Sequence, residues 1–211
     1  MTGLFISVEG IDGSGKSTQA HRLAETLRAA GRVVTETREP GGSDGAEEIR
    51  QLLVTGAPGR WSPETEVLLF TAARRDHVER TIRPALAAGQ VVVCDRYADS
   101  TRVYQGDDPE RRSLIDELHT RLVGLEPDLT LWFDLPLELA AGRLAERAGG
   151  EDRFEQKGRE FQAALAARFE ALAAACPDRI RRVDASANPD TVAAQVINVV
   201  APALPKVLTN G

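Results

Sequence analysis

Eight residues near the start of the chain have the types and spacing of a phosphate-binding loop. Residues 10–17 read GIDGSGKS and match the pattern G-x-x-x-x-G-K-[ST], between an apolar run and a helical pattern. The glycines of such a loop let successive backbone N–H groups converge on phosphate oxygens, and the helix that follows adds a partial positive charge. We expect Lys16 to bridge the outer phosphates of a nucleotide and the Ser17 hydroxyl to hold Mg²⁺. A glycine-rich turn that binds no ligand is the alternative.

Two residues, one in this loop and one directly after it, have more than one reading. A carboxylate such as Asp12 opposes phosphate binding unless it faces another partner, for example a metal-bound water or a substrate hydroxyl, and a turn-forming aspartate is the alternative. Thr18, like Gln19, also fits an ordinary first turn of a helix. With both included, the residues expected to contact the donor nucleotide are Gly10, Ile11, Asp12, Gly13, Ser14, Gly15, Lys16, Ser17 and Thr18.

Arginines near the ends of predicted strands suit a second phosphorylated ligand. Arg38 follows the second strand and Arg96 the third, and open α/β sheets bind ligands at the carboxyl ends of their strands. Arg74 and Arg75, on a predicted helix, extend this cluster, because a guanidinium grips phosphate through two hydrogen bonds. For any one arginine, a solvated surface charge is the alternative. Asp95 has the position of a Walker B carboxylate that acts on Mg²⁺ through water, or else of a helix N-cap.

Short apolar runs and helical patterns alternate along the chain and must position these residues. The apolar runs predict strands at 4–8, 33–34, 91–94, 129–133 and 180–183. Helical spacing predicts helices at 16–30, 64–88, 111–124, 136–147, 155–175 and 189–200, with Pro84 as a potential interruption. The alternation predicts an α/β protein with a mostly parallel sheet flanked by helices on both faces. Together with the phosphate-binding loop and the five predicted strands, it indicates the P-loop NTPase fold with a five-stranded parallel sheet.

The composition narrows the classes of protein to consider. A chain of 211 residues, 42% of them hydrophobic, fits one globular domain. The net charge of −6 argues against broad attraction to nucleic acid or to an anionic membrane, and no segment is apolar enough to span a bilayer. Cys94 and Cys176 lie far apart, without the spacing of a metal site or a disulfide scaffold, so we expect a cytoplasmic protein. The histidines, His21, His77 and His119, are each read as surface residues.

Five segments resemble one enzyme family. FISVEGIDGSGKSTQ, TREPGG, LLFTAARRDHV, DRYADSTRVYQG and DRFE occur in the order and approximate spacing of bacterial thymidylate kinases. DAS at 184–186, followed by a helix, resembles the closing segment of that family. The resemblance implies an enzyme of dTTP biosynthesis that transfers the γ-phosphoryl group of ATP to dTMP. The products are dTDP and ADP, and the implied cofactor is Mg²⁺. It also implies a homodimer, for which the helices at 64–88 and 111–124 offer a seam.

The resemblance also implies roles for individual residues on the acceptor side. Arg38 and Arg96 hold the acceptor phosphate, and Asp12 meets the sugar 3′-hydroxyl. Phe70 stacks on the thymine ring, although core packing beside its leucine neighbours is the alternative. The remaining residues expected to contact dTMP are Arg74 at the base O4, Tyr104 against the deoxyribose, and Ser100, Thr101 and Gln105 on the base side.

A mobile lid at about 146–155 is expected within the single kinase domain over residues 1–211. The phosphate-binding loop carries no arginine between its glycines, a feature of relatives that supply catalytic cations from the lid. The candidates are Arg147 and Arg153, which act with Lys16 and Arg96 as the catalytic set. Arg143 is expected to stack on the donor adenine.

Two other functions stay open at the level of sequence. One is a kinase for another small acceptor, such as a different nucleotide or a deoxynucleoside. The other is a nucleotide-binding switch without transfer activity, although the chain lacks the N-K-x-D segment with which a GTPase reads guanine. An acceptor-specificity assay separates the first alternative, and ATP binding without transfer indicates the second.

Overall fold

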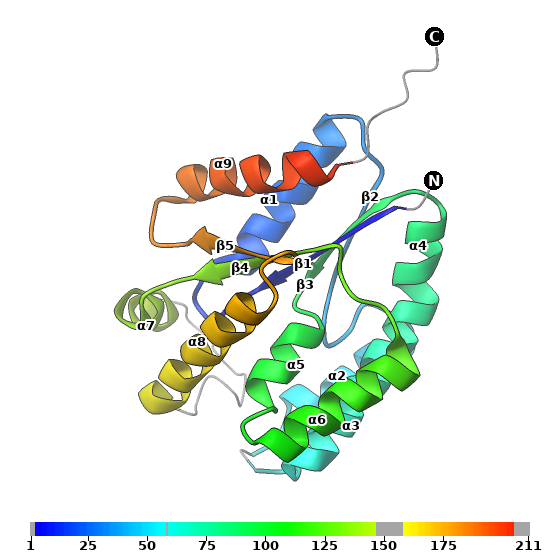
Figure 1. Cartoon of the computed structure of the whole chain (residues 1–211), viewed down its shortest axis with the longest axis vertical. Coiled ribbons are helices and arrows are strands. Elements are labelled where there is room, and N and C mark those ends of the chain that lie inside the picture. Colours follow the sequence, from blue (N-terminus) through cyan, green and yellow to red (C-terminus); the bar gives the residue numbers. More distant parts are fainter. Residues whose placement is uncertain (1–2, 58, 147–157, 205–211) are drawn as a thin grey trace.

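The chain forms a five-stranded parallel sheet, as a computed structural model that describes residues 3–57, 59–146 and 158–204 shows (Figure 1). The strand order is β2-β3-β1-β4-β5. The strands are β1 (Leu4–Glu9), β2 (Val34–Arg38), β3 (Val91–Asp95), β4 (Leu129–Asp134) and β5 (Ile180–Asp184). The predicted α/β class and the parallel sheet of five strands are therefore confirmed.

Helices cover both faces of this sheet. All six residues of β1 are buried, with Ile6 and Val8 in one core cluster and Phe5 in the other. A strand that is buried on both faces needs helices on both sides of the sheet. Helices α1 and α9 lie on one face, and α4, α5 and α8 lie on the other (Figure 1). The helices are α1 (Lys16–Ala29), α2 (Asp44–Val54), α3 (Pro63–His77), α4 (Arg83–Ala87), α5 (Ala98–Tyr104), α6 (Pro109–Leu118), α7 (Leu137–Glu146), α8 (Gly158–Ala175) and α9 (Pro189–Val200).

Short non-α segments extend three of these helices. A π-helical segment, η1 (Val78–Ile82), joins α3 to α4, and a second, η2 (His119–Val123), extends α6. The 3₁₀ turn η4 (Ala201–Ala203) follows α9. Pro84 lies in the first turn of α4, directly after η1. Proline has no N–H group for an i→i−4 hydrogen bond, so the expected interruption takes the form of a change in helix type.

The register of the central strands brings the predicted site residues to one edge of the sheet. Val8 is paired with Asp95, and Asp95 is paired with Arg38 on its other side. The phosphate-binding loop follows β1, and Arg96 follows β3, so both start from the same carboxyl edge. Within the described part of the chain, no helix combines the length and the apolar character needed to cross a membrane.

Candidate active site

The loop between β1 and α1 is shaped to bind an anion. Gly15, the N-cap of α1, has the left-handed φ of 83° and offers no side chain to cap the helix. Gly13 has a φ of 79°, and a Cβ there would lie 2.8 Å from the carbonyl oxygen of Ala140. Only glycine fits both constraints, and the first N–H groups of α1 stay free of a side-chain cap. Lys16 is 7% exposed, and its Nζ donates to the Ile11 carbonyl over 3.3 Å.

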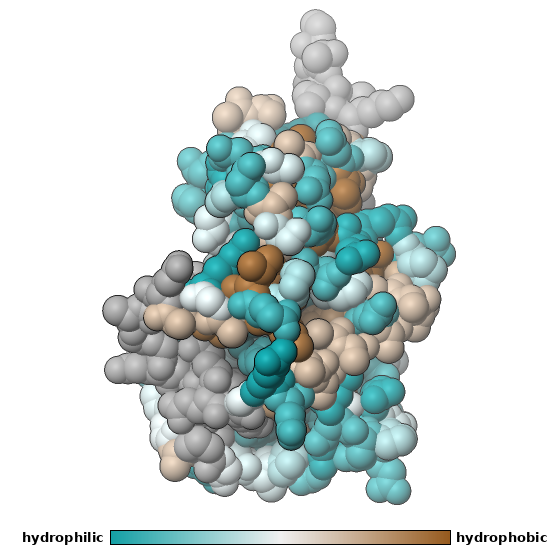
Figure 2. All heavy atoms as spheres, turned by 90° about the vertical axis from the view of Figure 1, so that its left-hand side faces the viewer, coloured by the Kyte–Doolittle hydropathy of each residue, from teal (hydrophilic) through white to brown (hydrophobic). Residues whose placement is uncertain are grey.

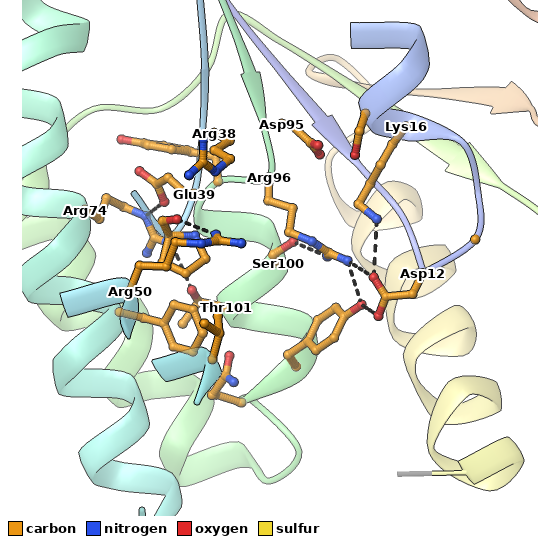
Figure 3. A pocket seen from close by; sticks show the side chains of 18 of the residues that line it. Asp12, Lys16, Arg38, Glu39, Arg50, Arg74, Asp95, Arg96, Ser100 and Thr101 are labelled. Atoms are coloured by element: carbon orange, nitrogen blue, oxygen red, sulfur yellow. Dashed lines mark hydrogen bonds and ion pairs between the residues drawn. The ribbon is translucent and has the colours of Figure 1, made fainter. Parts of the chain in front are cut away.

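Asp12 lies among cations, not in an isolated turn. Its carboxylate accepts hydrogen bonds from Lys16 Nζ over 3.4 Å, from the Tyr104 hydroxyl over 3.2 Å and from the Arg96 guanidinium (Figure 3). Burial alone raises the pKa of a carboxyl group, but Arg96 and Lys16 outweigh it and lower the pKa of Asp12 to about 2. Burial and the nearby Arg96 guanidinium lower the pKa of Lys16, and Asp12 opposes that shift. The phosphate-binding loop therefore carries an ionised carboxylate, that of Asp12, between the cations of Lys16 and Arg96.

A buried glutamate shapes the turn that carries Arg96. Arg96 has a positive φ of 67°, which is rare for a residue with a side chain. The next backbone N–H, of Tyr97, donates to Glu9 Oε1 over 2.7 Å, and Ser100 Oγ lies 2.5 Å from Glu9 Oε2. Arg96 in turn donates to Ser100 Oγ over 3.0 Å. Burial, together with the Asp99 carboxylate, raises the pKa of Glu9 to about 8.

One cavity of about 260 Å³ joins the phosphate-binding loop to the predicted acceptor residues (Figure 3). Arg38, after β2, contacts both oxygens of Glu47 at 3.0 Å. Arg50 of α2, which the sequence patterns did not single out, donates to the Pro40 carbonyl over 2.6 Å. The cavity is lined by Asp12, Gly13, Gly15, Lys16, Ser17, Arg38, Glu39, Pro40, Arg50, Val54, Phe70, Arg74, Asp95, Arg96, Tyr97, Ser100, Thr101, Tyr104 and Gln105.

The far end of this cavity carries the residues expected at the base. Arg74 is 3% exposed, and its Nε donates to Glu39 Oε2 over 2.7 Å while one terminal nitrogen donates to Thr101 Oγ1 over 2.8 Å. Its guanidinium lies 5.2 Å from the centre of the Tyr97 ring. Phe70, half-buried one helical turn before Arg74, lines the cavity and is not enclosed in the core.

Three expectations about side-chain placement were wrong. Arg75 does not line the acceptor cavity, because one residue along a helix rotates the side chain by about 100°; it bonds Glu79 and the Leu122 carbonyl at the surface. His77 and His119 are 0% and 4% exposed, so the surface reading holds only for His21. His77 could have been found from its spacing, because it shares a helix face with Arg74 at i−3. The lid candidates Arg147 and Arg153 lie outside the described residues.

A second cavity, of about 620 Å³, opens on the other side of the phosphate-binding loop. Thr18 and Gln19 line it together with Arg143 of α7 and residues 185–189 after β5. Arg143 donates to the Ala185 carbonyl over 3.1 Å and to the Gly13 carbonyl over 3.5 Å. On the side of the molecule that carries α7, small strongly hydrophobic areas lie among hydrophilic ones (Figure 2). Arg143 is thus placed beside the loop, where the donor was expected.

Two oxygen donors that could hold a magnesium ion lie at the carboxyl edge of the sheet. Asp95 Oδ1 is buried and has no hydrogen-bond partner in the described structure, and Ser17 is exposed on the same cavity. Among the described residues there is no group of three or more His, Cys, Asp or Glu side chains that could hold a metal. A serine hydroxyl with one carboxylate suits Mg²⁺, which keeps several waters and takes further oxygens from substrate phosphates.

The sequence profile described as thymidylate kinase matches residues 8–196 of the chain. The thymidylate kinase of Jannaschia sp. (strain CCS1) is 61% identical over 201 residues, which cover 95% of this chain and 97% of the relative. That of Dinoroseobacter shibae is 62% identical over 196 residues, covering 92% and 95%. The crystal structure of thymidylate kinase from Ehrlichia chaffeensis matches with a TM-score of 0.75 at 33% identity, covering 95% of this chain and 99% of that one, and confirms the predicted P-loop NTPase fold. The chain belongs to the thymidylate kinase family.

Proposed function

We propose that this chain transfers the γ-phosphoryl group of ATP to dTMP, giving dTDP and ADP, with the residues of the joint cavity in the roles described below. The observation that supports these roles is that one cavity holds both Lys16 and the acceptor arginines Arg38 and Arg96. A donor and an acceptor phosphate bound in one cavity can meet with the attacking and leaving oxygens in line, which is the arrangement that phosphoryl transfer requires.

On the donor side, the N–H groups of the loop and Lys16 bind the phosphates of ATP. Thr18 and Arg143 border the second cavity, where we place the adenosine part of ATP. Ser17 and Asp95 would hold Mg²⁺, Asp95 through water. When bound, Mg²⁺ neutralises charge on the β- and γ-phosphate oxygens.

On the acceptor side, Arg38 and Arg96 hold the phosphate of dTMP and reduce its repulsion from ATP. The base lies at the other end of the cavity, stacked on Phe70, with O4 accepting from Arg74. Ser100, Thr101 and Gln105 border the base, and Tyr104 lies against the deoxyribose. Tyr104 also bonds Asp12, so the two side chains lie together where the sugar is expected.

Asp12 is suited to accept a hydrogen bond from the sugar 3′-hydroxyl. Because its pKa is lowered to about 2, its carboxylate is ionised throughout the physiological range. Lys16 and Arg96 both contact Asp12, so a bound phosphate competes with it for these cations. The acceptor phosphate oxygen is already nucleophilic, and no general base is required. We assign the stabilisation of the remaining negative charge on the transferring phosphoryl group to a lid arginine, Arg147 or Arg153.

Substitution of the loop lysine tests the catalytic part of the proposal. Among the described residues, Lys16 supplies the only ammonium group that lines the joint cavity, and Lys16→Ala removes it. We expect turnover to fall by about 10³-fold, the typical cost of losing a cation at the transferring phosphoryl. Turnover is measured as ADP release with dTMP as acceptor. Near-normal turnover in a folded variant would show that the loop has no catalytic role.

Two neighbouring arginines give a matched test of base reading. Arg74→Ala should raise the KM for dTMP by at least tenfold, because it removes a charge-assisted hydrogen bond to the base. Arg75→Ala removes an identical side chain that points away from the acceptor cavity and should leave that KM unchanged. A panel of other monophosphates and deoxynucleosides, assayed in parallel, identifies any better acceptor. ATP binding without transfer to any of them would contradict the proposal.

A further inference from the structure

A chain of buried hydrogen bonds lies behind Arg74. Glu39, 5% exposed, accepts from Arg74 Nε at Oε2 over 2.7 Å. Its other oxygen, Oε1, lies 3.0 Å from His77 Nδ1, and His77 Nε2 lies 2.7 Å from Thr37 Oγ1. His77 is completely buried. The chain therefore runs from β2 through the following loop to two positions of α3.

The chemistry of Glu39 fixes the direction of these bonds. A carboxylate buried beside an arginine is ionised and can only accept, so His77 Nδ1 must carry the hydrogen that it shares with Oε1. His77 Nε2 shares the second hydrogen bond of the ring with Thr37 Oγ1. Each oxygen of the buried carboxylate thus has its own donor, which satisfies the requirement for burying a charge.

The ring of His77 is also confined sterically. A Cβ on Gly42 would lie 2.3 Å from His77 Nε2, so only glycine allows the backbone of that loop to pass this close. Gly42 is itself held, because its carbonyl accepts from Thr81 Oγ1 over 2.7 Å. With its two nitrogens bonded and one edge against Gly42, the ring has little freedom to rotate.

We propose that His77 is a positioning residue of the acceptor site, which orients the Arg74 guanidinium by fixing the Glu39 carboxylate. Arg74 uses Nε for Glu39 and one terminal nitrogen for Thr101, so the plane of the guanidinium is set by two partners. The remaining N–H groups are then presented to the cavity at a fixed angle. Without the His77 bond, Glu39 can rotate about its terminal torsion, and Arg74 follows it. This inference rests on the proposed reading of the acceptor base by Arg74.

Two amide substitutions separate positioning from simple packing. His77→Asn places an N–H donor near the position of Nδ1, so it keeps the bond to Glu39 and loses that to Thr37. His77→Gln reaches the position of Nε2 and leaves Glu39 Oε1 without its donor. We expect His77→Gln to raise the KM for dTMP about tenfold with kcat and the KM for ATP unchanged, whereas His77→Asn stays within about threefold of wild type. His21→Gln, at an exposed histidine that also contacts a glutamate, should change nothing.

The outcomes are distinct once folding has been checked by circular dichroism and thermal unfolding. A normal KM for dTMP in folded His77→Gln overturns the proposal, and so does equal impairment of dTMP and ATP by both His77 variants. If His77→Gln does not fold, Glu39→Gln takes its place, since it removes the negative charge that holds Arg74 and should raise the same KM. Arg74→Lys is measured in parallel. If Arg74→Lys leaves the KM unchanged, base reading itself is wrong; if it raises the KM and His77→Gln does not, only the positioning role fails.

Discussion

Glu9 combines two conflicting demands at a single residue. Its carboxyl group accepts a hydrogen bond from the Tyr97 N–H, and this bond shapes the turn before α5. The same carboxyl group is completely buried and lies close to Asp99. Burial disfavours the charged form, and a neighbouring carboxylate disfavours it further. The pKa of Glu9 therefore rises from 4.5 to about 8, so the folded protein holds a proton there that the unfolded chain releases.

This proton makes stability depend on pH in a direction that can be measured. Between about pH 4.5 and pH 8, Glu9 is protonated in the folded state and ionised in the unfolded state, so unfolding releases a proton. The contribution of Glu9 to the free energy of unfolding is therefore largest at low pH and is lost as the pH rises through this window. Glu9→Gln is neutral at every pH and can still accept from Tyr97. We expect its free energy of unfolding, relative to wild type, to rise from pH 5 to pH 8 in urea titrations. A constant difference would show that Glu9 is ionised in the folded protein.

Some residues of the site could be predicted from the sequence and others could not. Arg38, Phe70 and Arg96 were assigned to the acceptor from local motifs, and all three line one cavity. Glu9 and Glu39 were missed, because an acidic residue in a strand or a loop has no distinctive local pattern. Their importance comes from partners that are 88 and 35 residues away in the chain.

At the scale of elements, the end of one helix contributes a measurable part of stability. Asn188 is the N-cap of α9, and its side-chain oxygen accepts from the N–H groups of Asp190 and Thr191 at 3.1 and 2.9 Å. Asn188→Ala leaves these donors without a side-chain partner and should lower the free energy of unfolding by about 1 kcal/mol. For a chain of this size, that corresponds to a Tm lower by about 2–4 °C.

The same helix offers a matched control for the cap. Asn198 is exposed within α9, and Asn198→Ala replaces the same residue type with a better helix former. It should leave the Tm unchanged or raise it slightly. If both variants lower the Tm equally, the effect of Asn188→Ala does not come from capping.

The elements that the sequence predicted are those whose pattern is local. Strands β1, β3 and β4 are continuous apolar runs because they are buried on both faces, and their bounds agree with prediction within one residue. Strand β2 lies at the edge of the sheet and is partly exposed, and because most of its residues are polar, the predicted strand at 33–34 shares only Val34 with it. Helix α5 has only seven residues, several of them weak helix formers, and depends on the burial of Thr101 and Val103.

At the scale of the whole molecule, three exposed leucines are candidates for the homodimer interface that the sequence predicted. Leu52, Leu68 and Leu122 are 40%, 54% and 47% exposed. They lie on α2, α3 and η2, and α3 contacts both of the other elements. Exposed large apolar side chains on neighbouring elements favour association. Leu68 and Leu122 lie in the segments 64–88 and 111–124, along which the sequence predicted a homodimer seam, whereas Leu52 of α2 lies outside that predicted seam.

Charging the middle of this surface tests the dimer. We expect the wild-type chain to sediment with twice the mass of 22.8 kDa, and Leu68→Glu to sediment as a monomer, because a buried and repeated carboxylate across a two-fold axis is strongly unfavourable. Leu139→Glu is the matched control, since Leu139 is 45% exposed on α7, outside the leucine surface, and its substitution should leave the mass unchanged. Helix α3 also carries Phe70 and Arg74 toward the acceptor cavity, so separation of the subunits should raise the KM for dTMP more than that for ATP. A monomeric wild type would refute the dimer, and a dimeric Leu68→Glu would place its interface elsewhere.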